Sequence, residues 1–472
     1  MPNFETKSTV ESDVTDLYKY HANPGAINRL IPPWENISIE QRSDSLVVGS
    51  EVVIRNALFG IPVTWHAKHT QLNPPNSFQD IQLSGPFKTW IHDHHFQSVG
   101  VGLSTLEDRI YFETKFGWLG TLGWPIVRRK LDAMFAYRHR TTSADLRLQS
   151  FLRPFISERS LRIGVTGSSG MIGRRLVDLI SVLGHSAVRI LRPTSNDRPQ
   201  DFPLSSVAVV WQPGQGFSGN GSMENLDAVI HLAGKGIADG RWTEAAKQSI
   251  RDSRIEGTRM LVADLCNLAS PPRAFISASG VGIYGDRNSD TLDEFEPPGT
   301  DFLAKLAVDW ESAALGFEQS GNRVAIGRLG IAIHPQQGAL SKLLLPFKLG
   351  FGGPVGSGRQ YWSWIDIDDA AAGFLYLAAN PNAVGAYNFV APEQTDNRSF
   401  SKTLGHVLGR PSLLPAPAFA LRILLGEMAD AMLLASTRAN CRRLVDDGFP
   451  FRSPTLEACL KHVLGYESTT LK

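Results

Sequence analysis

Three polar residues, Ser279, Tyr284 and Lys305, have the chemical types needed to handle a proton on an alcohol or carbonyl oxygen. A tyrosine hydroxyl becomes a usable acid or base near neutral pH when a nearby lysine ammonium lowers its pKa. A serine hydroxyl can hold the reacting oxygen, and the lysine can also hydrogen-bond a ribose. These three residues form the candidate catalytic group, with Tyr284 either the proton donor or a structural, substrate-contacting residue.

A strand, a glycine-rich turn and a helix precede this group. The apolar residues 161–166 predict the strand, and the apolar spacing of residues 171–183 predicts the helix. A helix start offers unpaired N–H groups and a positive dipole end, and glycine lets the backbone approach a phosphate closely. A second strand at 186–193 completes a βαβ unit, which favours a dinucleotide site. The residues expected to bind the cofactor here are Gly167, Ser168, Ser169, Gly170, Met171, Ile172 and Gly173.

Arg192 stands at the end of the second strand, where such folds recognise the ribose 2′ position. NAD-specific sites usually carry an acid there, whereas a 2′-phosphate favours a cation. Arg189 and Arg198 are nearby in the sequence, and the first acid is Asp197. NADP(H) is therefore favoured over NAD(H), unless Arg192 is only a solvated charge at the strand end.

From residue 161 onward the chain alternates strands and helices, which predicts an α/β fold with a doubly wound parallel sheet. Further strands are expected at 207–211, 227–234 and 274–279, with a helix capped by Thr243 and another at 255–268. Leu232, Ala233 and Gly234 follow the fourth strand at the carboxyl edge of the sheet. Ligands of such folds bind at that edge, and small residues allow close approach.

Residues 1–150 contain mostly short strand-like segments, unlike the alternating strands and helices after residue 161, and this predicts a separate α+β domain. Short alternating segments at 37–39, 46–54, 63–67, 77–83, 89–96 and 105–114 predict strands, with helices at 14–20 and 124–140. Strands wrapped around a long helix would enclose a small cavity. We expect a linker at 151–160 and a second domain at 161–472 that ends in a helical extension.

Histidines gather in the predicted strands of the first domain. Alternation places His92 and His94 on one face of a strand and His95 on the other, while His66 and His69 lie in an earlier strand. No cysteine or acidic residue stands at ligand spacing from them in the sequence. Packed or hydrogen-bonded histidines are therefore favoured over a metal site, and no metal is expected.

Bulk composition excludes several classes of function. The formal net charge is +1, so nothing points to nucleic acid or an anionic membrane. No secretory signal and no apolar run long enough for a membrane helix are visible. Three widely separated cysteines, Cys266, Cys441 and Cys459, suit a reducing cytoplasm. We expect a cytoplasmic protein with a small-molecule substrate, whose oligomeric state the sequence does not determine.

The first domain resembles the helix-grip (START-like, SRPBCC) superfamily. The resemblance rests on the motifs at 23–26, 29–34, 85–92 and 135–139. It implies an antiparallel sheet around a long helix and a cavity. Members of this superfamily often hold apolar ligands, but the resemblance identifies no particular ligand.

The second domain resembles extended short-chain dehydrogenase/reductases, in which Ser279, Tyr284 and Lys305 match the active-site strand, a following Tyr-Gly pair and the lysine of a Tyr-x-x-x-Lys motif. Asp301 stands where that motif has its tyrosine. The closer resemblance is to the YfcH-like epimerase family, an atypical branch that also lacks this tyrosine. The shared motifs include 166–173, 232–234 with Arg241 and Trp242, 279–285, 302–311, 356–365, 410–429 and 448–451. The branch implies that Arg241 and the loop before it belong to the cofactor site.

Two positions that differ from the family's usual residues, and one group of aromatic residues, bear on which class of substrate the protein binds. Lys235 replaces the branch's usual Glu and Asp366 its usual His; Lys235 either adds to an anion site or is a solvated loop residue. The aromatic patch Tyr361, Trp362 and Trp364 favours apolar or stacking contact over a diphosphate clamp, or it is core.

Two functions follow from these patterns. The first is an NADP(H)-dependent oxidoreductase or epimerase in which Lys305 anchors the nicotinamide ribose. The second is a non-catalytic NADP(H)-dependent sensor or scaffold whose N-terminal cavity binds a hydrophobic ligand.

Overall fold

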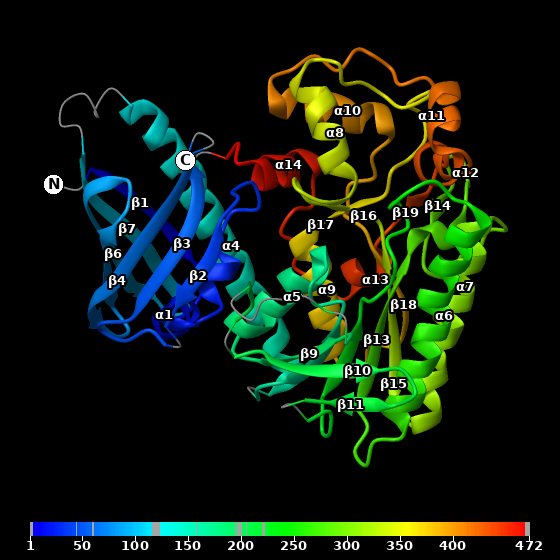
Figure 1. The fold of residues 1–472 in the computed structure, drawn as a ribbon, viewed down its shortest axis with the longest axis horizontal. Helices are drawn as coiled ribbons and strands as arrows, with labels where there is room; N and C mark the ends of the chain where they lie inside the picture. Colours follow the sequence, from blue (N-terminus) through cyan, green and yellow to red (C-terminus); the bar gives the residue numbers. More distant parts are fainter. Residues whose placement is uncertain are drawn as a thin grey trace.

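The computed structural model describes residues 3–43, 45–58, 61–115, 123–157, 159–193, 195, 201–203, 205–219 and 222–467. It has two parts, each built on one large sheet (Figure 1). The first sheet is antiparallel and packs on a long helix, and the second is mostly parallel and lies between layers of helices.

The first part is a seven-stranded antiparallel sheet in the order β1-β7-β6-β5-β4-β3-β2. Its strands are β1 (Phe4–Val10), β2 (Ser38–Arg42), β3 (Glu51–Leu58), β4 (Ile61–Asn73), β5 (Ser77–Ser84), β6 (Phe87–Gly100) and β7 (Leu103–Thr114), and its helices are α1 (Val14–Ala22), α2 (Ala26–Arg29) and α4 (Trp124–Ile156). Alternate residues of β6 face inward, so Trp90, His92 and Phe96 are buried. Strand β1 was not expected from the sequence.

Helix α4 continues well beyond residue 140, where the sequence-based prediction ended it. Leu148, Leu152 and Ile156 recur every four residues and pack into the main apolar core, which keeps the chain helical. Most of the expected linker at 151–160 is therefore the end of this helix. The core that receives it contains side chains from both parts of the molecule.

The second part confirms the predicted Rossmann-type sheet, in the order β11-β10-β9-β8-β12-β13-β15-β18. All neighbours pair in parallel except β10 and β11. The strands are β8 (Arg162–Thr166), β9 (Ser186–Leu191), β10 (Val207–Gln212), β11 (Gly216–Ser218), β12 (Ala228–His231), β13 (Ala274–Gly280), β15 (Arg323–Leu329) and β18 (Gly385–Phe389). The order reverses beside β8, so a crevice at the carboxyl edge is expected there.

Helices α5 (Met171–Val182) and α9 (Ile367–Ala379) pack together, as do α6 (Glu244–Cys266) and α7 (Phe302–Leu315). Thr243 caps α6 by accepting a hydrogen bond from Ala246 N, and the two helical segments expected around 243–268 are one helix. Most of the remaining strands and α-helices form an extension above the sheet edge (Figure 1). They are β14 (Thr291–Leu292), β16 (Ile331–Ile333), α8 (Gly338–Lys348), β17 (Trp364–Asp366), α10 (Asn397–Leu408), α11 (Ala418–Leu425), α12 (Glu427–Ala429), β19 (Arg438–Ala439) and α14 (Leu456–Leu464). Helix α13 (Arg442–Asp446) instead packs against β18.

Five charged side chains meet where the two parts touch, and we call them the interface cluster: Arg29, Asp145, Arg175, Asp368 and Arg452. Arg29 Nε donates to Asp145 Oδ2 at 2.7 Å, and Arg175 Nε donates to Asp368 Oδ1 at 2.7 Å. Arg29 and Arg452 each bond to both aspartates. All five are buried. Burial would raise the pKa of Asp145, but the guanidinium groups of Arg29 and Arg452 hold it below its ordinary value.

Within the described residues, every helix is either too short or too polar to cross a membrane.

Candidate cofactor and active site

The glycine-rich turn between β8 and α5 has a backbone that only glycine permits at two positions. Gly167 has φ +65°, and a Cβ on Gly173 would lie 2.2 Å from the Gly167 carbonyl oxygen. Ser169 and Gly170 are exposed, while Ser168 is buried and its Oγ has no hydrogen-bond partner. The first turn of α5 begins at Met171, so its backbone N–H groups lack helical partners. Exposed backbone at Ser169 and Gly170, followed directly by a helix start, is the arrangement that anion-binding turns have.

Thr166 fastens this turn to the loop that follows β12. Its Oγ1 accepts hydrogen bonds from Leu232 N at 3.1 Å and Ala233 N at 3.2 Å, and lies 2.8 Å from His231 Nδ1. Burial lowers the pKa of His231 to about 4, so the imidazole is neutral at physiological pH. The sequence analysis missed Thr166 and His231. Their shared position as the last residues of two neighbouring parallel strands is the signal that could have found them.

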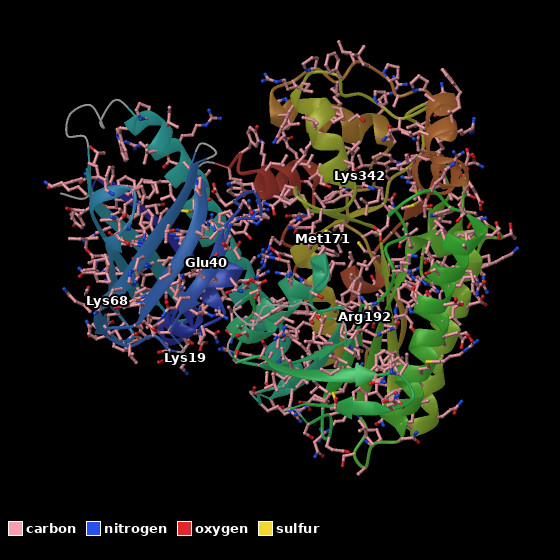
Figure 2. All side chains as sticks on the ribbon, in the orientation of Figure 1. Lys19, Glu40, Lys68, Met171, Arg192 and Lys342 are labelled. Carbon is pink, nitrogen blue, oxygen red and sulfur yellow. The ribbon has the colours of Figure 1, made fainter. Side chains whose placement is uncertain are left out.

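Arg192 follows the last residue of β9 and is exposed. Arg189 is different, because its guanidinium is buried 3.9 Å from the centre of the Phe202 ring. The other two nearby residues considered in the sequence, Asp197 and Arg198, lie outside the described residues. Figure 2 labels Arg192 and Met171, which lie in the half of the molecule that holds the parallel sheet.

Ser279 lies at the carboxyl end of β13 and is buried. Its hydroxyl donates to Glu311 Oε1 at 2.7 Å. Arg328 holds the same carboxylate with two hydrogen bonds, Nε to Oε1 and Nη2 to Oε2, both at 2.9 Å. Because the Ser279 proton is directed at Glu311, the serine oxygen has lone pairs left to accept a hydrogen bond from a ligand hydroxyl.

Tyr284 is fully buried, and its hydroxyl is already engaged. It donates to Asn388 Oδ1 at 2.7 Å and accepts from Arg328 Nη1 at 2.9 Å. Burial raises the pKa of Tyr284 to about 12, even though the Arg328 guanidinium opposes the rise. These contacts favour a role for Tyr284 in positioning Arg328 over a role in exchanging a proton with a substrate.

Lys305 is exposed on α7, the helix that also carries Glu311 of this network. Among the described residues, no hydrogen bond or ion pair joins its ammonium to Ser279 or Tyr284. Asp301, which takes the place of the expected tyrosine, caps α7 by accepting from Ala304 N at 2.8 Å. The structure therefore links Ser279 and Tyr284 through Glu311 and Arg328, without a hydrogen bond from Lys305 to either residue in the part of the chain that it describes.

Arg254 is a buried cation beside the cofactor loop that the sequence analysis did not single out. Its Cζ would lie 3.1 Å from a Cβ on Gly234, and its Nη1 donates to Lys235 O at 2.7 Å. Its guanidinium lies 5.0 Å from the centre of the Trp310 ring, and its Nε has no hydrogen-bond partner. Burial lowers the pKa of Arg254 to about 10. A buried, incompletely bonded guanidinium next to an exposed glycine is suited to an anionic or polar ligand.

The other cations of this loop point elsewhere. Arg241 is exposed, and its Nε would lie 3.2 Å from a Cβ on Gly426, at the start of α12. Lys235 Nζ donates to Ser249 Oγ at 2.9 Å on the surface of α6. Asp366 is used in the fold, since it caps α9.

Helix α8 of the extension reaches across the sheet edge. Lys342 Nζ donates to Ala238 O, which lies in the loop after β12, at 3.1 Å. The Met171 sulfur would lie 3.6 Å from a Cβ on Gly338, the first residue of α8. Figure 2 labels Met171, at the start of α5, and Lys342, on α8. The extension thus contacts the first residue of α5 and the loop after β12, on either side of the crevice.

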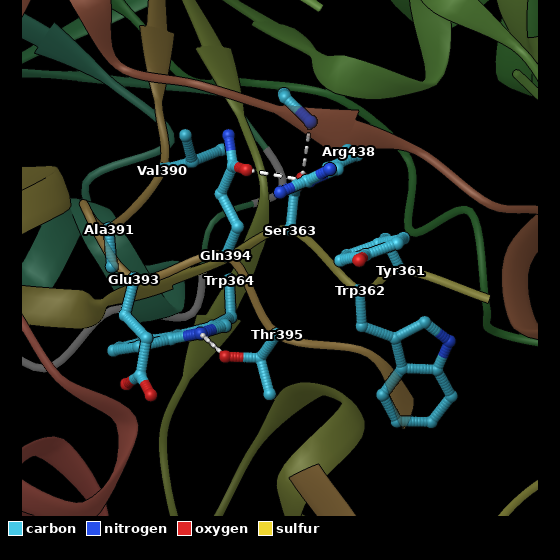
Figure 3. A pocket seen from close by; sticks show the side chains of 11 residues that line it. Tyr361, Trp362, Ser363, Trp364, Val390, Ala391, Glu393, Gln394, Thr395 and Arg438 are labelled. Atoms are coloured by element: carbon cyan, nitrogen blue, oxygen red, sulfur yellow. Dashed lines mark hydrogen bonds between the residues drawn. The ribbon is translucent and has the colours of Figure 1, made fainter. Parts of the chain in front are cut away.

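The aromatic patch proposed for substrate contact is mostly internal. Trp362 and Trp364 are 4% and 1% exposed. Figure 3 shows them in a small pocket with Arg438, whose Nε donates to Gln394 Oε1 at 2.7 Å and whose guanidinium lies 4.7 Å from the centre of the Tyr361 ring. Core packing, the alternative left open by the sequence, accounts for the two tryptophans.

Comparison with known proteins identifies the family to which this chain belongs. Residues 163–390 match the NAD dependent epimerase/dehydratase family, and residues 416–463 match a domain of unknown function (DUF1731). An epimerase family protein of Mycobacterium bovis is 36% identical over 307 residues, which cover 65% of this chain and 97% of that protein. The chain belongs to the NAD-dependent epimerase/dehydratase family. The family resemblance inferred for the second domain is therefore confirmed.

Two solved structures resemble this epimerase-family protein to different extents. A nucleoside-diphosphate sugar epimerase from Corynebacterium glutamicum has a TM-score of 0.78 and 26% identity, over 99% of this chain and 91% of that one. The human epimerase family protein SDR39U1, solved with NADPH, has a TM-score of 0.58 and 30% identity, over 64% of this chain and 99% of the human one. The first likeness extends over the N-terminal sheet as well.

Proposed function

We propose that this epimerase-family protein binds NADP(H) at the carboxyl edge of its parallel sheet. The glycine-rich turn from Gly167 to Gly173 would hold the pyrophosphate, and the loop from Leu232 to Gly234 would lie along the dinucleotide. Arg192 would face the 2′-phosphate, because it is an exposed cation at the end of β9. The human relative solved with NADPH supports this choice of cofactor.

The reaction proposed is an NADP(H)-dependent oxidation, reduction or epimerisation of a small molecule. The bound cofactor would supply or accept a hydride. In an oxidation the substrate hydroxyl would give its proton to Ser279 Oγ as Ser279 passes its own proton to Glu311 Oε1, and a reduction would run this transfer in reverse. Ser279 would hold the reacting oxygen, since its own proton is committed to Glu311 and its lone pairs can accept from a substrate hydroxyl. Glu311 and Arg328 would fix the orientation of Ser279. We assign Tyr284 to positioning Arg328, and Lys305 stays the predicted contact to the nicotinamide ribose.

Cofactor titration tests this proposal directly. NADPH and NADH are titrated into the purified chain and followed by tryptophan fluorescence, for the wild type, Arg192→Ala and Lys305→Ala. Losing a hydrogen bond to a charged phosphate costs about 1.5–3 kcal/mol, or roughly ten- to a hundredfold in Kd. Arg192→Ala should weaken NADPH by that factor and leave NADH unchanged. Arg129→Ala, an exposed arginine of α4 in the other part, is the matched control.

Failure has a clear form in this experiment. If neither dinucleotide binds to the wild type, the cofactor site is wrong. If both bind equally and Arg192→Ala changes neither, the NADP(H) preference is wrong while the dinucleotide site stands.

For the N-terminal part we propose a helix-grip domain that binds an apolar ligand. Its seven-stranded antiparallel sheet and the 33-residue helix α4 support this assignment. The aromatic cluster around Trp90, Phe112 and Phe135 would provide the apolar contacts.

A non-catalytic NADP(H)-dependent sensor is the second candidate, and the interface cluster favours it. Arg175 lies two residues after Gly173 of the cofactor turn and shares Asp368 with Arg29 of the N-terminal part. Linkage then requires that NADPH and the N-terminal ligand change each other's affinity by the same factor. Calorimetric titration of NADPH with and without the apolar probe 1-anilinonaphthalene-8-sulfonate, and the reverse, measures that factor. This candidate is excluded if the probe leaves the affinity for NADPH unchanged and NADPH leaves the affinity for the probe unchanged.

A further inference from the structure

The interior of the N-terminal sheet contains a cluster of histidines and aspartates, contributed by three neighbouring strands and one helix. His92 and His94 alternate on β6 and face inward. Asp80 of β5 is the register partner of His92, and Asp108 of β7 is the register partner of His94. Helix α4 adds His139 from the opposite side. Cross-strand pairing therefore places a carboxylate on each flank of the two β6 histidines.

Three ligand atoms of this cluster are arranged as a metal site requires. His92 Nδ1 and His94 Nε2 each lie 3.4 Å from Asp80 Oδ2, and all three atoms lie within 4.8 Å of one another. Ligand atoms about 2.1 Å from a tetrahedral zinc are separated by about 3.4 Å from each other. The two measured distances match this separation, and one ligand atom from each of the three residues lies within 4.8 Å of the other two.

Asp108 provides the outer support that metal-bound histidines usually have. His92 Nε2 lies 2.9 Å from Asp108 Oδ1 and His139 Nε2 lies 2.6 Å from Oδ2, both as hydrogen bonds. His94 Nδ1 lies 2.8 Å from Oδ1, although not in a hydrogen-bonding direction. A carboxylate on the second ring nitrogen fixes the tautomer of a ligating histidine and raises its basicity. In this arrangement His92 Nδ1 is left free to bind a cation.

We propose that Asp80, His92 and His94 bind a divalent transition-metal ion inside the N-terminal sheet, and that Asp108 orients His92 through their hydrogen bond. Two imidazoles and one carboxylate suit Zn²⁺ or Fe²⁺, whereas Mg²⁺ and Ca²⁺ prefer all-oxygen sites. Three protein ligands leave at least one coordination position open. The side chains of Asp80 and His94 are 17% and 13% exposed, so the site has contact with solvent.

The competing arrangement contains no metal. In it a protonated His92 bridges Asp80 and Asp108, and the cluster is a buried ion-pair network. The same side-chain positions fit both arrangements. A direct measurement of metal binding therefore decides between them.

The experiment uses the full chain after treatment with a chelator. Calorimetric titration with Zn²⁺, anaerobic titration with Fe²⁺, and the visible absorption of bound Co²⁺ measure stoichiometry, metal preference and ligand type. We expect one ion per chain. His94→Gln and Asp80→Asn should abolish binding, and Asp108→Asn should weaken it about ten- to a hundredfold as a supporting residue does. NADPH binding to each variant serves as the check that the chain is folded.

His95→Gln is the matched control, because it changes the neighbouring histidine of the same strand on the opposite face. It should bind the metal as the wild type does. The proposal is overturned if the chelator-treated wild type binds no ion, or if His94→Gln binds it as tightly as His95→Gln. Should Asp108→Asn or Asp80→Asn fail to fold, the pair His94→Gln and His95→Gln still decides the question.

Discussion

The two sheets of this protein place their polar residues in opposite locations. In the parallel sheet, β12 and β13 are buried along nearly their whole length, and the groups available to a ligand lie at the carboxyl edge. In the antiparallel sheet, the polar cluster around His92 and Asp108 lies in the interior, against α4. The difference follows from geometry, because a parallel strand covered on both faces leaves only its end open, whereas an antiparallel strand offers one whole inner face.

The polar residues at the carboxyl edge also differ from those of the interface cluster in how completely they are hydrogen-bonded. Groups at the carboxyl edge, such as Ser168 and Arg254, have unpaired buried atoms. The interface cluster consists of charges that already bond to one another. Substitutions at the edge should therefore change binding, and substitutions among the paired charges should change the free energy of unfolding.

The largest effect is expected for Arg29→Met in the interface cluster. It leaves Asp145 buried with one cation fewer, and breaking a buried ion pair costs about 3–5 kcal/mol. Urea unfolding should show that loss, while Kd for NADPH changes little under conditions where the variant is folded. Arg422→Met, which removes an exposed ion pair with Asp430, is the control and should leave the urea midpoint unchanged. A variant with wild-type stability would contradict the structural role of the cluster.

Asp178→Asn on α5 should have a pH-dependent effect of similar size and opposite sign. Burial raises the pKa of Asp178 to about 7 from the ordinary 3.8, so the folded state disfavours its charge. The penalty is absent below pH 4, grows between pH 4 and 7, and reaches about 4 kcal/mol above pH 7. The variant should therefore be more stable than the wild type at pH 8 and nearly equal at pH 4. Thermal unfolding at both pH values measures this, and a difference independent of pH would refute it.

Gly173→Ala should weaken NADPH binding. Its loss in the free energy of unfolding should be smaller than that of Arg29→Met in the interface cluster. The new methyl group would meet the Gly167 carbonyl, so the turn must shift and its N–H groups move away from the pyrophosphate. Losing one hydrogen bond to a charged phosphate costs about 1.5–3 kcal/mol, or roughly ten- to a hundredfold in Kd. Gly257→Ala in α6 is the control, because the nearest atom to its Cβ would lie 3.8 Å away. Equal NADPH affinity in both variants would show that the turn does not hold the cofactor.

The smallest effect is expected for Tyr284→Phe. Arg328 keeps its bonds to Glu311 when the tyrosine hydroxyl is lost, so the cost is that of about one hydrogen bond, about 1 kcal/mol. Urea unfolding should detect it, and Kd for NADPH should stay within twofold. Once a substrate is identified, a loss of turnover comparable to that of Ser279→Ala would instead return Tyr284 to the catalytic group.

Much of the second part could be predicted from the chain. Glycine spacing around Gly167 and the apolar strands fix a βαβ start, because both are local properties of the backbone. The surroundings of Tyr284 and Lys305 could not be predicted in this way. Whether a tyrosine is buried against Arg328, or a lysine is exposed on α7, depends on residues that are distant in the sequence. The extent of α4 was likewise set by packing, since Ile156 is helical through its contacts with the core.

The histidine cluster shows the limit most clearly. The sequence alone placed His92 and His94 on one face, because side chains alternate along any strand. It offered no acidic partner, since Asp80 and Asp108 lie 12 or more residues away from His92 along the chain. Only the register of β5, β6 and β7 brought those carboxylates beside the imidazoles. Local backbone preference determined the faces and the turns, and long-range pairing decided which charges became neighbours.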